Sequence, residues 1–89
     1  MINKSELYAK CIKRWGESAQ CLQAMEECGE LIVAINKFAF RGAISVDDLA
    51  SEIADVEITT EQLRAMIGND IVDKAKHEKL MRLAVRVDL

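Results

Sequence analysis

Glycine and proline, the residues that break helices most readily, are scarce along this chain. There is no proline, and the four glycines are Gly16, Gly29, Gly42 and Gly68. Such a chain favours long, uninterrupted helices. Apolar periodicity and the positions of three of the glycines predict helices over residues 4–14, 19–40, 46–67 and 71–85. Four helices joined by short loops imply an all-α fold that resembles an antiparallel four-helix bundle, in a single domain spanning residues 1–89.

Capping residues and apolar stripes refine this prediction. Ser45 precedes the third helix, with Asp48 at the third helical position as in a capping box. Asn3 or Ser5 lies near the start of the first helix. The second helix is apolar nearly all round from Leu31 onward, which predicts a central position with packing on more than one side. The expected core stripe of the third helix consists of Leu49, Ile53, Val56, Thr60, Leu63 and Ile67.

The composition is unusually aliphatic for so short a chain. Hydrophobic residues make up 51% of the 89 residues, and aromatic residues only 4%. One small bundle cannot bury that much aliphatic surface, so we expect self-association into a homodimer or homotetramer. The net charge of −3 argues against general nucleic-acid binding, which needs a basic face.

Membrane association and disulfide formation are not expected. No apolar run approaches the length of a membrane-spanning helix, and no signal peptide opens the chain. The three cysteines, Cys11, Cys21 and Cys28, form no C-x-x-C pair. We interpret them as buried, reduced thiols of a cytoplasmic protein rather than as a disulfide framework or a zinc site. Cys21 and Cys28 could share a helix face, which leaves a redox role open.

Two pairs of acidic residues lie within apolar helical stretches. The first is in the sequence E-E-C-G-E at residues 26–30, and the second is E-I-A-D at residues 52–55. Residues three apart share a helix face, so each pair can aim two carboxylates at one point. Ala34 lies on the same face of the second helix, and its small side chain leaves room for a ligand. Crowded carboxylates repel one another, and Mg²⁺, which prefers oxygen ligands, is the simplest compensating ion.

The acid pairs have less specific interpretations as well. Taken singly, each pair is more often part of a solvated helix surface, because glutamate is a good helix former. The chain does not offer the Cys/His ligand set that a zinc site requires. A di-iron bundle requires Glu-x-x-His motifs, and the single histidine, His77, follows Lys74 at that spacing. The presence of both pairs, in helices expected to face each other, favours magnesium.

The acid pairs and their surroundings resemble the MazG-like family of all-α nucleoside triphosphate pyrophosphohydrolases. The matching motif is E-E-x-x-E at residues 26–30, followed after residues 31–51 by E-x-x-D at residues 52–55, with Trp15-Gly16 upstream. The resemblance covers the chain from about Trp15 to Leu83. It implies a helical bundle that dimerises, often as a dimer of dimers. It also implies hydrolysis of nucleoside or deoxynucleoside triphosphates to the monophosphate and pyrophosphate, in a house-cleaning or pool-control role.

The resemblance also implies roles for individual residues. Carried over by motif position, the Mg²⁺ (or Mn²⁺) ligands would be Glu27, Glu30, Glu52 and Asp55. Glu26 would orient a ligand or activate water, which completes the expected catalytic set. Some relatives carry Asn-x-Lys-x-x-Arg in the last helix. Here Lys79 and Arg82 match that pattern as phosphate contacts, an interpretation favoured slightly over solvated surface charges, whereas His77 replaces the asparagine.

Other candidate substrate contacts come from the second helix and from Trp15, at the end of the first helix. Lys37 and Arg41 could contact phosphates, although a solvated helix end that complements the helix dipole explains them equally well. Trp15 is the one large aromatic side chain able to stack a base, with Gln20 or Gln23 as a partner. A tryptophan at a helix end also commonly anchors a core or an interface.

Two non-enzymatic functions stay open at this point. One is a non-catalytic helical module that binds a partner protein and keeps the acidic cleft as a vestigial or structural metal site. The other is a plain structural bundle whose acidic residues lie on the surface. A plain bundle predicts that Mg²⁺ leaves the melting temperature unchanged, because a ligand stabilises only the state that it binds.

Overall fold

The computed structural model describes residues 1–89 as four α-helices without a strand, which confirms the all-α prediction. The helices are α1 (Lys4–Trp15), α2 (Glu17–Asn36), α3 (Val46–Ile67) and α4 (Asn69–Arg86), and a π-helical turn, η1 (Lys37–Arg41), follows α2. The predicted second helix therefore ends in a widened turn rather than as an α-helix. None of the helices combines the length and the apolar character needed to cross a membrane.

Side-chain caps begin two of the helices as the sequence predicted. The Asn3 side chain accepts a hydrogen bond from the backbone N–H of Glu6 at 3.1 Å. Ser45 Oγ accepts one from the backbone N–H of Asp48 at 3.0 Å. Each bond satisfies a backbone donor that has no partner within the helix.

Glycines make the sharp changes of direction between elements. Gly42 ends η1 with φ 58°, and Gly68 separates α3 from α4 with φ 111°. Glycine adopts positive φ without the steric cost that a Cβ atom brings. Gly68 alone makes the second break, so α4 begins at Asn69 rather than near Ile71.

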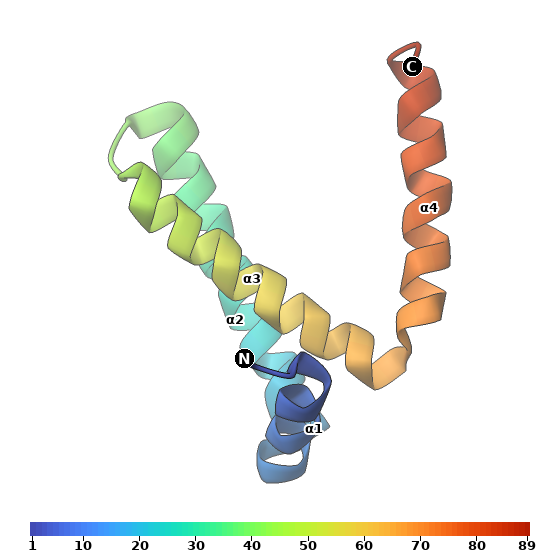
Figure 1. Ribbon diagram of the computed structural model, residues 1–89. Coiled ribbons are helices and arrows are strands. Elements are labelled where there is room, and N and C mark those ends of the chain that lie inside the picture. Colours follow the sequence, from blue (N-terminus) through green and yellow to red (C-terminus); the bar gives the residue numbers. More distant parts are fainter.

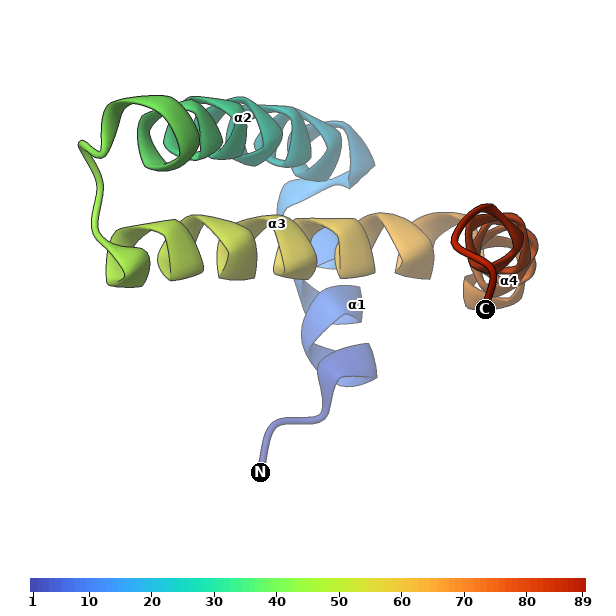
Figure 2. The ribbon, with the colours of Figure 1, turned by 90° about the horizontal axis from the view of Figure 1, so that it is seen from above.

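The hairpin of α2 and α3 is the most extensive helix pair in the chain (Figures 1 and 2). One set of buried or half-buried residues repeats at spacings of three and four on both helices, as in a coiled coil. We call this set the α2–α3 seam: Gln20, Ala24, Glu27, Leu31 and Ala34 of α2, with Glu52, Asp55, Thr59, Gln62 and Met66 of α3. Six of these ten residues are polar, so the hairpin encloses carboxylates and amides where a coiled coil encloses leucines.

The apolar stripe predicted for α3 is not the face that the hairpin buries. Ile53, Thr60 and Ile67 are exposed, whereas Thr59 and Gln62 are buried. The prediction was wrong because it followed the apolar residues, and α3 instead turns its polar face toward α2. Leu49, Val56 and Leu63 of the stripe are half-buried at its edge.

The outer face of α2 is also open. Ile32, predicted to be enclosed, is 69% exposed, so the expected packing of α2 on several sides is not met within one chain. The cysteines are unpaired, as predicted, but Cys21 and Cys28 are exposed rather than buried. A single chain therefore leaves an apolar outer surface on its hairpin.

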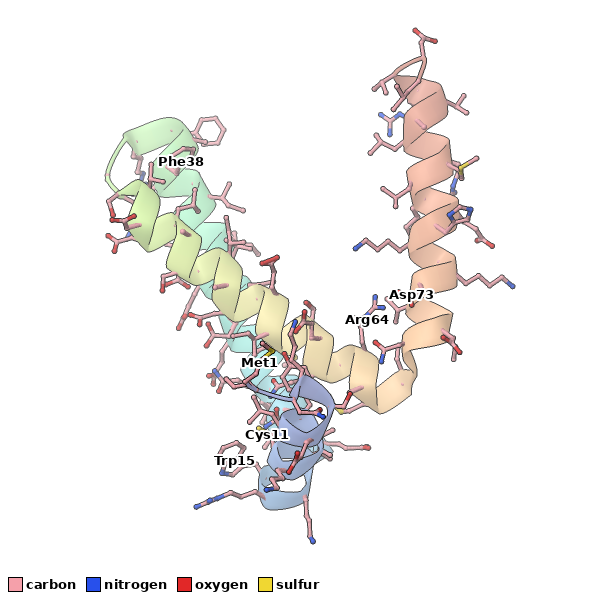
Figure 3. The ribbon with its side chains drawn as sticks, in the orientation of Figure 1. Met1, Cys11, Trp15, Phe38, Arg64 and Asp73 are labelled. Carbon is pink, nitrogen blue, oxygen red and sulfur yellow. The ribbon has the colours of Figure 1, made fainter.

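The two remaining helices differ in how they meet the hairpin. Tyr8 of α1 is buried, and its hydroxyl donates a hydrogen bond to Glu61 Oε1 of α3 at 2.5 Å. After Gly68, α4 turns away from α2 and α3 and projects on its own (Figures 1 and 2). Arg64 of α3 and Asp73 of α4 form an ion pair across this corner (Figure 3). The four helices do not close into a bundle within one chain.

Tyr8→Phe is expected to lower the free energy of unfolding by about 1 kcal/mol at pH 7. Burial, and then the bond to Glu61, raise the pKa of Tyr8 to about 12, so its hydroxyl remains a donor at neutral pH. The same bond lowers the pKa of Glu61. The carboxylate's contribution is therefore present above its unfolded pKa and is lost as the pH falls through the folded pKa. Urea unfolding should show a smaller difference between the two proteins at pH 3.

Lys4→Met is the matched control, because Lys4 contacts the same carboxylate from the exposed side at 3.3 Å. Its loss should cost less than about 0.5 kcal/mol, since exposed ion pairs are screened by solvent. An equal cost of Tyr8→Phe at both pH values would show that the hydroxyl does not act through the Glu61 carboxylate.

Candidate metal centre

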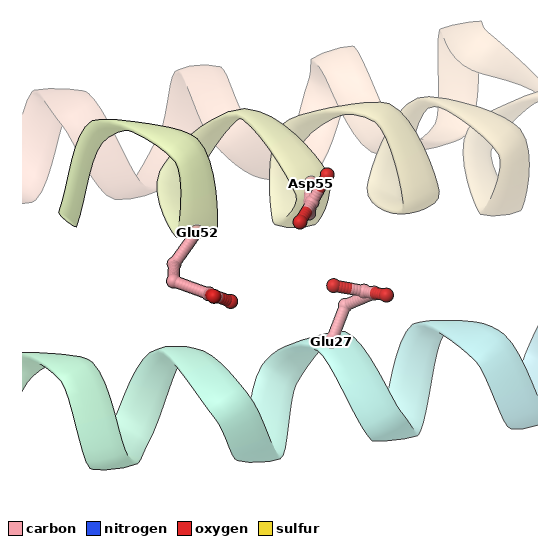
Figure 4. A group of neighbouring side chains, drawn as sticks. All are labelled: Glu27, Glu52 and Asp55. Atoms are coloured by element: carbon pink, nitrogen blue, oxygen red, sulfur yellow. The ribbon is translucent and has the colours of Figure 1, made fainter. Parts of the chain in front are cut away.

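Three carboxylates meet in the middle of the α2–α3 seam. Glu27 projects from α2 toward Glu52 and Asp55, which lie one turn apart on α3 (Figure 4). One oxygen atom from each side chain lies within 4.8 Å of those of the other two, and all three residues are half-buried. The structure thus brings together one member of the first acid pair and both members of the second.

Two oxygen atoms of this group have no hydrogen-bond partner. Gln23 Nε2 donates to Glu27 Oε1 at 2.6 Å, but Glu27 Oε2 is buried without a donor. Glu52 Oε2 is likewise buried and unpaired. Buried acceptors left unpaired are costly. A hard divalent cation that prefers oxygen ligands, such as Mg²⁺ or Mn²⁺, is the partner that these atoms fit.

The crowding of these carboxylates also shifts the pKa of Glu27. Burial raises the pKa of the Glu27 carboxyl, and the negative charges of Glu30 and Asp55 raise it further. The hydrogen bond from Gln23 opposes this shift without cancelling it. A carboxylate whose charged form is disfavoured by its neighbours gains most from a nearby cation.

The first acid pair is divided by the fold. Glu30 is exposed and lies outside the close group, although its charge acts on Glu27. Glu26 is exposed and stands about 100° around α2 from Glu27, because consecutive helical residues are separated by that step. Of the predicted acidic residues, the structure therefore places Glu27, Glu52 and Asp55 at the centre, Glu30 at its edge and Glu26 away from it.

A cleft of about 580 Å³ continues from the carboxylates along the seam toward the start of α2. Its lining residues are Trp15, Ala19, Gln20, Gln23, Glu27, Asp55, Ile58, Thr59 and Gln62. Trp15, Gln20 and Gln23, which the sequence suggested for base recognition, thus share one cleft with two of the carboxylates.

The predicted basic contacts lie elsewhere in the chain. Lys37 is in η1 and does not line the cleft. Lys79 and Arg82 are exposed on α4, the helix that projects away from the hairpin (Figure 1), and so is His77. One chain alone does not bring the predicted phosphate contacts of α4 to the carboxylates.

Sequence reasoning missed two polar residues of the cleft, Thr59 and Gln62. They follow Asp55 by four and seven residues, so all three share one face of α3. That spacing was visible in the sequence. The apolar stripe of α3 gave the stronger signal for a buried face, because polar residues rarely form the buried face of a helix.

Comparison with family models, with curated proteins and with solved structures gave no match to this chain. The MazG-like resemblance accordingly rests on the motif residues themselves.

Mg²⁺ or Mn²⁺ is expected to raise the melting temperature of the protein. A cation that binds only the folded state at a hundred times its Kd adds about 2.7 kcal/mol to the free energy of unfolding. Glu52→Gln should abolish most of this gain, whereas Glu78→Gln, an equal change of charge on exposed α4, should retain it. A melting temperature that does not respond to either cation would contradict the metal centre.

Glu27→Gln is expected to raise the melting temperature of the metal-free protein at pH 7. The pKa of Glu27 is raised in the folded state. Its ionisation therefore lowers the free energy of unfolding as the pH rises from the unfolded pKa through the folded pKa. Below the unfolded pKa the carboxyl is protonated in both states, and the penalty is absent. The neutral amide removes this penalty, so the stability gain over wild type should shrink toward pH 4. A loss of stability at pH 7 would show that the carboxylate is not under repulsion.

Proposed function

We propose that the protein is a Mg²⁺-dependent hydrolase of nucleoside or deoxynucleoside triphosphates, which releases the monophosphate and pyrophosphate. The observation that carries the proposal is the convergence of Glu27, Glu52 and Asp55, two of them with unpaired buried oxygens, next to a cleft that Glu27 and Asp55 line. The motif resemblance to MazG-like pyrophosphohydrolases supplies the reaction. A house-cleaning or pool-control role follows from the same resemblance.

In this proposal the residues in and beside the α2–α3 seam have different roles. Glu27, Glu52 and Asp55 hold the cation, and Glu30 adds a fourth carboxylate at the edge of the group. Gln23 fixes the Glu27 carboxylate through its hydrogen bond. When bound, Mg²⁺ neutralises phosphate charge and lowers the pKa of a coordinated water.

Hydrolysis of the α–β phosphoanhydride requires no nucleophile from the protein. Water attacks the α-phosphorus, the bond from that phosphorus to the bridging oxygen breaks, and pyrophosphate leaves with that oxygen. A carboxylate accepts the proton of the water. Glu30 is better placed for that proton transfer than Glu26, because its charge acts on Glu27 while Glu26 faces away. The chain brings no serine–histidine or cysteine–histidine pair to this cleft.

Self-association belongs to the same proposal. The outer faces of the hairpin and of α4 carry exposed apolar side chains, among them Ile32, Phe40, Leu80, Met81 and Leu83. Exposed aliphatic surface on this scale favours a homodimer or homotetramer, in which helices of two chains complete a bundle. The projecting α4 can then bring Lys79 and Arg82 to the carboxylates of a partner chain.

The direct test is pyrophosphate release from each ribo- and deoxynucleoside triphosphate in the presence of Mg²⁺. Turnover is expected with wild-type protein and should fall at least about a hundredfold in Glu52→Ala, since a ligand and charge-balancing group is lost. Glu78→Gln should turn over normally. If no triphosphate releases pyrophosphate and the protein binds no metal, the proposed enzymatic activity is refuted.

A complementation experiment tests whether α4 acts across subunits. Glu52→Ala and Arg82→Ala should each be inactive or strongly impaired. If the two variants are mixed and re-paired at random, about a quarter of the sites regain both residues, because half of the dimers are mixed and each has one intact site. No recovery in mixtures shown to exchange subunits would contradict a shared site.

One observation favours a second candidate, the non-catalytic partner-binding module. Most large apolar side chains of this chain are exposed, and a second protein could cover them in place of a second copy. The acidic cleft would then be a vestigial or structural metal site. This candidate predicts capture of a different protein, and a capture that persists when Mg²⁺ is removed.

A further inference from the structure

The cleft contains a group of polar side chains that the metal centre does not use. Gln20 of α2 is only 6% exposed and Gln62 of α3 only 8%, and both line the cleft beyond the carboxylates. Gln20 Oε1 is buried without a hydrogen-bond partner. An unpaired acceptor in such a position costs stability unless a ligand or water supplies the donor.

Thr59 adds a second acceptor to the lining of the same cleft. Its hydroxyl proton is committed, because Thr59 Oγ1 donates to the backbone carbonyls of Asp55 and Val56, both at 3.1 Å. A hydroxyl whose proton is used in this way can only accept from a further partner. The cleft therefore offers two acceptors to a ligand.

Trp15 supplies an aromatic wall at the same end of the cleft. It is the only tryptophan of the chain, and it lines the cleft together with Gln20 and Thr59. Figure 3 shows its ring at the base of α1, clear of the helix. Flat bases stack on such rings whatever their sequence, so the ring contributes affinity while the acceptors contribute selection.

We propose that this end of the cleft binds the nucleobase and selects cytosine and adenine, whose exocyclic amino group lies where guanine, thymine and uracil carry a carbonyl oxygen. The inference rests on the proposed function, and it adds to it the class of base. Cytosine and adenine each present an amino group with two N–H donors, whereas thymine presents a carbonyl oxygen at the corresponding position. Two acceptors satisfy an amino group and repel a carbonyl oxygen. Gln20 and Thr59 are then the specificity-determining residues.

The experiment uses nucleosides, which lack phosphate and need no metal. Trp15 fluorescence reports the binding of deoxycytidine against deoxyuridine and of deoxyadenosine against deoxyinosine. In each pair a carbonyl oxygen replaces the amino group, and an N–H replaces the neighbouring acceptor nitrogen of the ring. The amino member should bind about tenfold more tightly, since one buried hydrogen bond is gained and one unpaired acceptor is satisfied. The ratio of kcat/KM for dCTP over dUTP should show the same preference.

Matched variants test whether Gln20 and Thr59 cause the base preference. Gln20→Leu and Thr59→Val each remove one acceptor with little change in shape, and each should reduce the preference to within about twofold. Cys21→Ser, on the exposed neighbouring position of α2, should leave the preference intact. Circular dichroism shows whether each variant is folded, and the two independent variants keep the test valid if one is not.

Three results would overturn the proposal: equal binding of both members of each pair, tighter binding of the carbonyl member, or no fluorescence response to any nucleoside at millimolar concentration. Each is separable from failure of the proposed function. Pyrophosphate release without base preference would refute the base selection alone. Selective nucleoside binding without pyrophosphate release would refute the hydrolase alone.

Discussion

The repulsion among three half-buried carboxylates is the constraint on which the rest of this structure depends. Glu27 faces Glu52 and Asp55 across the seam, and two of their oxygens are buried without a donor. The surrounding protein does not supply a compensating positive side chain to these oxygens. The hairpin must therefore tolerate the charge, protonate a carboxyl or bind a cation, and a divalent ion removes the repulsion most completely.

This arrangement reverses the usual distribution of polarity in a helical hairpin. Carboxylates, amides and Thr59 lie between α2 and α3, and many aliphatic side chains face outward. Burial of apolar surface is the main stabilising term in folding, so a single chain with few buried apolar residues gains little from it. Association through the outer faces would supply the missing burial and would leave the polar seam for ligands.

The sequence was sufficient for the helices but not for their faces. Caps at Asn3 and Ser45 and breaks at Gly16, Gly42 and Gly68 are local signals, so the helix boundaries were predictable within a few residues. The rotation of α3 about its axis depends on its contacts with α2, and a stripe of apolar residues predicted the wrong face. The direction of α4 depends on the Gly68 corner and the pair between Arg64 and Asp73, which no periodicity encodes.

The candidate site was predictable to a similar degree. Spacing within each motif placed Glu27, Glu52 and Asp55 on suitable faces, and the structure brings them together. The i, i+3 relation could not show that Glu30 lies at the edge, because that depends on where α3 crosses α2. Thr59 and Gln62 were hidden for a different reason, since a polar side chain is normally at the surface and only tertiary packing buries it.

Titration of the protein with Mn²⁺, followed by electron paramagnetic resonance of the free ion, tests the central claim most directly. The account predicts loss of the free-ion signal on addition of wild-type protein, and paramagnetic broadening of amide resonances confined to the middle of α2 and α3. Glu27→Gln should weaken both effects, and Mg²⁺ should compete for the same site. A free-ion signal unchanged by wild-type protein at millimolar Mn²⁺ would contradict a divalent-cation centre between the two helices.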